Sequence, residues 1–186
     1  MDFKLVLEKL LMGFKKENVR YALIGGLALG AWGVTRSTVD IDFLVLFEDM
    51  DKVDRIMNKL GYSVRYKSEN VSQYISPLKI FGEIDFLHAF RKIAVSMLQR
   101  AEERKMFNET IPVKVLKIED LIGLKVQAIA NNESRKNMDL SDIESLIKEN
   151  KADINWDTLE EYFDLFDFKA LFNELRRKIN ADNKQK

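Results

Sequence analysis

The segment 21-YALIGGLALGAWGVTRSTVDIDFLVL-46 decides the fold of this chain. It opens with a short apolar run, Tyr21–Ile24, which stops at two glycines where the backbone can adopt angles closed to other residues. A brief helix-forming stretch, Leu27–Trp32, follows, and Val39–Leu46 then returns to a strand-like pattern. The segment therefore predicts a strand, a glycine turn, a short helix and a second strand.

The second strand carries two acids, Asp40 and Asp42, which alternate with Ile41 and Phe43. A strand has a period of two, so both carboxylates lie on one face, with their Cα atoms roughly 6.5 to 7 Å apart. Two neighbouring carboxylates repel each other, and a hard divalent cation relieves that repulsion. The pair predicts a Mg²⁺ site whose shell a substrate phosphate completes.

Length and composition place the chain among globular proteins. Its 186 residues suit one domain with a helical extension and a buried core, and 46% hydrophobic with 32% charged residues argue against disorder. A net charge of zero argues against a surface devoted to nucleic acid. The chain has no cysteine, so neither a disulfide nor a cysteine-built zinc site can form. Its N-terminus is too charged for a signal peptide, and no apolar run is long enough for a membrane span. We therefore expect a cytoplasmic protein that does not engage a membrane.

Periodicity along the rest of the chain predicts an α/β (α+β) protein with a mixed β-sheet flanked by helices and a helical C-terminal extension. Apolar spacing predicts helices over 3–17, 48–60, 93–101, 120–131 and 135–148, and helical spacing continues over 156–179 in the C-terminal helices. Short β-like runs predict strands over 62–66, 71–75, 78–87, 105–107 and 111–116. We expect a core over 1–117, a helical region over 118–186 packed on it, and a polar tail from 180.

The order of motifs resembles the signature of the nucleotidyltransferase (DNA polymerase β-like) superfamily. The matching residues are the Gly-Gly pair at 25–26, the Thr-Arg pair at 35–36 and the Asp-Ile-Asp at 40–42. Within the superfamily, the sequence of these motifs is similar to that of the AbiEii-type nucleotidyltransferases of toxin–antitoxin systems and of the small aminoglycoside and lincosamide nucleotidyltransferases. The resemblance implies Mg²⁺-dependent transfer of a nucleoside monophosphate from a nucleoside triphosphate (NTP) to a hydroxyl.

The resemblance also implies a third carboxylate on a strand beside the Asp-x-Asp strand. Asp85 matches it, and Glu83, which shares its face, is the alternative; an edge-strand acid facing water is the other interpretation. On this basis Asp40, Asp42 and Asp85 are the predicted catalytic and metal-binding residues. Asp85 would also accept the proton of the incoming hydroxyl.

Four residues near the first acids are predicted to bind the nucleotide. Gly25 and Gly26 would let backbone N–H groups approach the β- and γ-phosphates, and Arg36 would neutralise their charge. Thr38 could add a hydroxyl contact, although a β-branched residue is also an ordinary strand former.

Lys125 lies in a predicted helix whose residues three and four positions away are all apolar: Leu121, Ile122, Ala128 and Ile129. Its ammonium could reach water along that apolar surface or could bind a triphosphate. The segment 118–129 resembles the AbiEii-type helix whose lysine holds the nucleotide phosphates. Asp139 and Asp142 on the next helix resemble the two acids of the AbiEii-type helix that follows, where an acid is implicated in catalysis or positioning. The alternatives are an acid that stabilises the helix dipole for Asp139 and a solvated surface charge for Asp142. We predict nucleotide binding for Lys125 and Asp142.

The two branches of the superfamily that the chain resembles differ in the acceptor of the nucleoside monophosphate. An AbiEii-like enzyme would act on an RNA end or another nucleic acid, would have a cognate antitoxin as partner, and would need a basic patch, for which Arg104, Lys105, Arg135 and Lys136 are candidates. An antibiotic-modifying enzyme would act on a small-molecule hydroxyl and would need an acidic pocket instead. A non-catalytic nucleotide-binding protein of the same fold is the third possibility.

Overall fold

The computed structural model describes residues 1–182 of the protein. Within it the chain forms two compact units. The sheet unit comprises residues 1–31 and 35–117, and the helical unit comprises residues 32–34 and, of the described residues, 118–182. Of the polar tail expected from residue 180, residues 180–182 belong to the last helix, and residues 183–186 lie outside the described residues.

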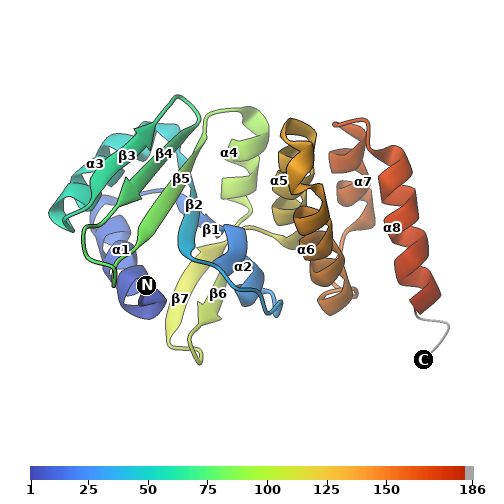
Figure 1. The fold of residues 1–186 in the computed structure, drawn as a ribbon, viewed down its shortest axis with the longest axis horizontal. Coiled ribbons are helices and arrows are strands. Elements are labelled where there is room, and N and C mark those ends of the chain that lie inside the picture. The colour runs from blue at the N-terminus through green and yellow to red at the C-terminus, as the bar shows by residue number, and fades with distance from the viewer. Residues whose placement is uncertain (183–186) are drawn as a thin grey trace. The chain divides into compact units, whose positions relative to one another are not determined.

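The sheet unit is built on a mixed seven-stranded sheet with the order β3-β4-β5-β2-β1-β7-β6 (Figure 1). Strands β2 and β5 run parallel, as do β1 and β7, and the other neighbours are antiparallel. The strands are β1 (Tyr21–Ile24), β2 (Asp40–Leu46), β3 (Ser63–Lys67), β4 (Val71–Ile75), β5 (Glu83–Ala89), β6 (Glu102–Met106) and β7 (Ile111–Val115).

Helices flank this mixed sheet, which confirms the predicted α/β (α+β) fold class. They are α1 (Phe3–Glu17), α2 (Gly25–Ala31), α3 (Met50–Lys59) and α4 (Lys92–Gln99), with a short 3₁₀ turn, η1, at Phe47–Asp49.

An aromatic cluster fixes α1 to one face of the sheet. The ring of Phe14 lies 5.2 Å from that of Phe43 on β2, and Phe43 stacks on Phe86 of β5 at 5.7 Å. All three side chains are fully buried. Because side chains alternate along a strand, Asp42 and Asp85, one residue before Phe43 and Phe86, lie on the opposite face.

Element boundaries differ from expectation in three places. The short helix begins at Gly25 itself rather than after the glycine pair. The strand expected from residue 78 begins at Glu83, because 76–82 closes a turn in which the Ser76 N–H donates to the Gly82 carbonyl at 3.1 Å. Strand β6 begins at Glu102 rather than 105, since its pairing with β7 reaches Val115 although its own residues are mostly charged.

The helical unit contains α5 (Ile118–Asn131), a 3₁₀ turn η2 (Glu133–Arg135), α6 (Lys136–Glu149), α7 (Trp156–Asp164) and α8 (Lys169–Asp182). Helices α5 and α7 meet where the Tyr162 hydroxyl donates to Asp120 at 2.6 Å. A Cβ on Gly123 would lie 2.8 Å from the Tyr162 ring, so this glycine admits the aromatic side chain. Among the described residues, no helix combines the length and apolar character needed to cross a bilayer.

One buried ion cluster ties the start of β1 to the start of α3. Asp49, 1% exposed, accepts hydrogen bonds from the backbone N–H and the guanidinium of Arg20 and from the Lys52 ammonium. Burial raises the pKa of the Asp49 carboxyl, but these cationic donors outweigh burial and hold the pKa well below its usual range.

We expect Asp49→Asn to lower the free energy of unfolding by about 2 kcal/mol at pH 7, because the charge-assisted bonds weaken. The pKa of Asp49 is depressed in the folded state, so its contribution is present above the unfolded pKa near 3.8 and is lost as the pH falls. The difference between wild type and variant, measured by urea unfolding, should therefore shrink at pH 3.

Glu48→Gln is the matched control, because Glu48 pairs with the same arginine at 3.2 Å but its side chain is 76% exposed. An exposed pair contributes at most about 1 kcal/mol. Equal losses in the two variants would contradict the buried role of Asp49.

Candidate functional site

Three acids meet on the face of the sheet away from the aromatic cluster. In the parallel pairing of β2 and β5, Asp42 lies opposite Asp85 and Asp40 lies opposite Glu83. Asp40, Asp42 and Asp85 are partly buried, and each offers a carboxylate oxygen within 4.8 Å of the others. The structure thus brings together the three acids that the sequence singled out, and Glu83 lies two residues before Asp85 on β5.

Gly25 makes room for this cluster. It has a φ of +66°, and a Cβ built on it would lie 1.9 Å from Asp42 Oδ2 and 2.9 Å from Asp42 Cβ. An L side chain at this position is both conformationally strained and sterically excluded. The end of β1 can therefore lie beside Asp42 only because residue 25 is glycine.

Gly26 and Thr38 lie next to the three acids. A Cβ on Gly26 would lie 2.8 Å from Thr38 Oγ1 and 3.2 Å from a guanidinium nitrogen of Arg36, so both side chains lie over this glycine. The Thr38 hydroxyl donates to Asp40 Oδ1 at 2.8 Å. Thr38 precedes β2 rather than lying on it, and its hydroxyl orients the first acid of the cluster.

Asp85 has an asymmetric environment. Its Oδ2 accepts a hydrogen bond from the Gln73 amide at 2.7 Å, whereas its buried Oδ1 has no hydrogen-bond partner among the described residues. Burial raises the pKa of the Asp85 carboxyl; the Gln73 amide opposes this effect, and the negative charges of Asp40 and Glu83 add to it. A buried, partnerless carboxylate oxygen is costly and calls for an explanation.

The donor set fits a hard divalent cation. Such ions take carboxylate oxygens as ligands, and three carboxylates offer them within a small volume. The partnerless Asp85 Oδ1 and the absence of a side chain at Gly25 leave a polar position that a cation would satisfy.

In the helical unit, Lys125 is 9% exposed and is held by two acids of α6. Its ammonium lies 3.0 Å from Asp139 Oδ1 and 2.5 Å from Asp142 Oδ2. Arg135 also pairs with Asp139 at 2.9 Å. Burial raises the pKa of the Asp139 carboxyl, but Arg135 and Lys125 lower it further than burial raises it. The Lys125 ammonium is thus paired with buried acids rather than extended into water. Nucleotide binding by Lys125 stays a prediction.

Sequence reasoning missed Gln73. It lies on β4 opposite Asp85 and is flanked along its face by Val71 and Ile75. A lone amide between two apolar residues of a half-buried strand face was the available signal, but its partner depends on a pairing between distant segments.

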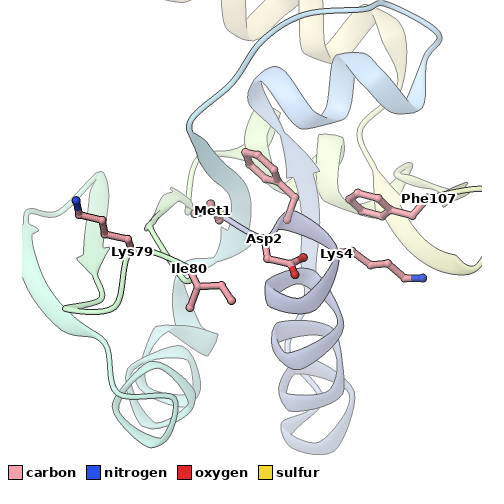
Figure 2. A pocket seen from close by; sticks show the side chains of 7 residues that line it. Met1, Asp2, Lys4, Lys79, Ile80 and Phe107 are labelled. Atoms are coloured by element: carbon pink, nitrogen blue, oxygen red, sulfur yellow. The ribbon is translucent and has the colours of Figure 1, made fainter.

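A second feature is an open hollow of about 700 Å³ at the start of α1. Figure 2 shows Lys79 and Ile80 on one side of it and Lys4 and Phe107 on the other. Its lining contains none of the three acids. The charged lining side chains, those of Asp2, Lys4 and Lys79, are all exposed, so the hollow presents no buried polar group to fix a ligand.

Comparisons with known proteins concern the family and the fold of the chain. A family model described as "uncharacterised nucleotidyltransferase" matches residues 3–176. The solution structure of the antibiotic-resistance factor ANT(2″)-Ia is similar at 16% identity, with 100% of both chains covered and a TM-score of 0.65. An antigenic nucleotidyltransferase-like protein from Paracoccidioides brasiliensis is similar at 17% identity, with 97% of this chain and 93% of that chain covered and a TM-score of 0.58.

The lincomycin-bound lincosamide adenylyltransferase LnuA is similar at 15% identity, with 76% of this chain and 94% of that chain covered and a TM-score of 0.52. At these identities the likeness concerns the fold alone. The comparison with curated proteins gave no match.

We expect Gly25→Ala to lower the free energy of unfolding by about 2 to 3 kcal/mol, because the added Cβ both strains the backbone and displaces Asp42. Gly61→Ala is the control: Gly61 also has a positive φ, +80°, but its Cβ would meet nothing within 4 Å, so only the backbone cost of about 1 kcal/mol remains. Urea unfolding of both variants measures the difference, and equal losses would contradict the close approach to Asp42.

We expect Lys125→Met to lower the free energy of unfolding by about 3 kcal/mol, because it removes the buried ion pairs of Lys125 with Asp139 and Asp142. The double variant Lys125→Met/Asp142→Asn should recover much of that loss, since it also removes one of the two negative charges that Lys125 meets. Urea unfolding at pH 7 checks both values. A single variant as stable as wild type would show that the cluster contributes nothing to folding.

Proposed function

The chain belongs to the nucleotidyltransferase family whose model matches residues 3–176, and we propose that it transfers a nucleoside monophosphate from an NTP to a hydroxyl acceptor with Mg²⁺. The observation that carries this proposal is the cluster of Asp40, Asp42 and Asp85 beside a glycine that admits no side chain. The bare oxygen of Asp85 supports the same conclusion, because a bound cation would give it a partner.

In the proposed reaction, the acceptor oxygen forms a bond to the α-phosphorus while the bond from that phosphorus to the pyrophosphate oxygen breaks. Asp40, Asp42 and Asp85 would hold the divalent ions, which would neutralise charge on the reacting phosphates. Asp85 would accept the hydroxyl proton, and pyrophosphate would leave. The remaining contribution of the protein is positioning, since Thr38 and Gln73 each hold one of the acids in place.

On the nucleotide side, backbone N–H groups of Gly25 and Gly26 would receive the triphosphate, and Arg36, whose guanidinium lies over Gly26, would neutralise it. The hydroxyl of Thr38 is engaged with Asp40, which supports an orienting role besides any contact to nucleotide.

Nucleotide binding by Lys125 and Asp142 stays a prediction of the AbiEii-like helix motif. The three-way pairing of Lys125 with Asp139 and Asp142 makes a role in holding α5 to α6 equally concrete.

The charges of the candidate site and of the expected basic residues favour a small cationic acceptor over RNA. Glu83 adds a fourth carboxylate to the face of the triad, where Arg65 pairs with it at 2.6 Å. The expected basic patch is largely compensated: Arg104 lies 3.9 Å from Glu102, Lys105 lies 3.7 Å from Glu109, and Arg135 pairs with Asp139. Affinity for nucleic acid requires cations free to neutralise phosphates.

Fold similarity to ANT(2″)-Ia, which a crystal structure shows with adenylyl-2″-tobramycin, supports the same choice. An RNA end as acceptor, a toxin role, a cognate antitoxin and a cytoplasmic location stay predictions of the sequence.

The experiment incubates the protein with each α-labelled NTP and Mg²⁺, against aminoglycosides, a lincosamide and RNA with a free 3′ hydroxyl. We expect labelled product and pyrophosphate with one acceptor class, loss of both with a chelator, and loss by at least about a hundredfold in Asp42→Asn. The thermal midpoint of Asp42→Asn should be unchanged or higher, because a repelling carboxylate is removed.

Asp51→Asn, which alters an exposed acid of α3, is the control and should retain activity. NTP binding without any transferred label would instead support a non-catalytic nucleotide-binding protein. A marked loss of stability in Asp42→Asn would mean that Asp42 serves folding.

A further inference from the structure

Gln73 stands directly opposite Asp85 where β4 pairs with β5. Its side-chain amide donates to Asp85 Oδ2 at 2.7 Å, a short and well-formed hydrogen bond. Strand β5 lies between β4 and β2, and the hydrogen bond to Asp85 links Gln73 to the triad.

This bond distinguishes the two oxygens of one carboxylate. With Oδ2 held by the amide, the carboxylate plane of Asp85 is restrained, and Oδ1 is the oxygen left buried without a partner. On the other side of the cluster, the Thr38 hydroxyl holds Asp40 Oδ1 in the same manner. Two of the three acids therefore each have an oxygen fixed by a neutral donor.

The neutrality of the donor matters. A lysine or arginine in place of Gln73 would also orient Asp85, but its positive charge would cancel the charge that attracts a divalent cation. An amide orients the carboxylate and leaves its full negative charge available. Outer hydrogen bonds of this kind set the orientation of metal-binding carboxylates and their affinity for the metal.

We propose that Gln73 is a positioning residue that holds Asp85 so that its Oδ1 faces the divalent cation shared with Asp40 and Asp42. This inference rests on the proposed function, because it presupposes a cation at the triad. It goes beyond that function by assigning a role to β4, a strand that carries none of the acids.

The test measures Mn²⁺ binding directly, by the electron paramagnetic resonance signal of free Mn²⁺ and by calorimetry, without NTP or acceptor. Gln73→Met keeps the length of the side chain and removes both N–H donors. We expect its Mn²⁺ affinity to fall about 10- to 100-fold. Gln73→Ala, which makes the same deletion without adding an apolar tip, serves in the same assay should the methionine variant not fold.

Ser72→Ala is the matched control. Ser72 is the neighbouring residue of β4 on the opposite face, where its hydroxyl pairs with His88 at 3.0 Å, so the change loosens the same strand without touching Asp85. Its Mn²⁺ affinity should equal that of wild type. A purely structural role for Gln73 would lower the thermal midpoint and leave Mn²⁺ affinity unchanged, which would overturn the inference.

Asp42→Asn separates the two proposals. If wild type binds Mn²⁺, Asp42→Asn does not, and Gln73→Met binds as wild type does, the positioning role is wrong and the metal site stands. If wild type itself fails to bind Mn²⁺, the metal site fails and the role of Gln73 fails with it.

Discussion

Three carboxylates within 4.8 Å of one another repel, and the sheet unit must hold them there. At an effective dielectric constant of about 20, each pair of unit charges at that separation costs roughly 3 to 4 kcal/mol. The acids cannot drift apart, because β2 and β5 pair in register from Asp40 opposite Glu83 to Leu46 opposite Ala89. Regular backbone pairing thus imposes the charge density of the site, and the divalent cation proposed above would compensate it.

The other face of the same strands supplies the stability that offsets this repulsion. Phe14, Phe43 and Phe86 are fully buried there, and burying one such side chain contributes about 2 to 3 kcal/mol. Each acid of the paired register, Asp42 or Asp85, is followed directly by one of these aromatic residues. Alternation along a strand therefore couples the site to the core, since a slip of one residue would bury the acids and expose the rings.

Sequence reasoning succeeded where the decisive geometry is local. The common face of Asp40 and Asp42 follows from the period of one strand. Asp85 needed a family resemblance, because its place depends on pairing between segments some forty residues apart, and its strand began later than expected because the preceding turn does not show in apolar periodicity. Burial of Lys125 was foreseeable from its apolar neighbours, whereas its partners Asp139 and Asp142 come from another helix, and only tertiary packing defines that contact.

Buried acids elsewhere in the chain show what a purely structural carboxylate requires. Asp49 and Asp139 are almost fully buried, and each is met by cationic side chains that lower the pKa of its carboxyl despite burial. Asp85 is treated differently: its protein donor is a neutral amide, one oxygen has no hydrogen-bond partner, and its pKa is raised. Lysines and arginines neutralise Asp49 and Asp139, whereas an amide meets Asp85, and this difference leaves the charge of Asp85 for a ligand from outside.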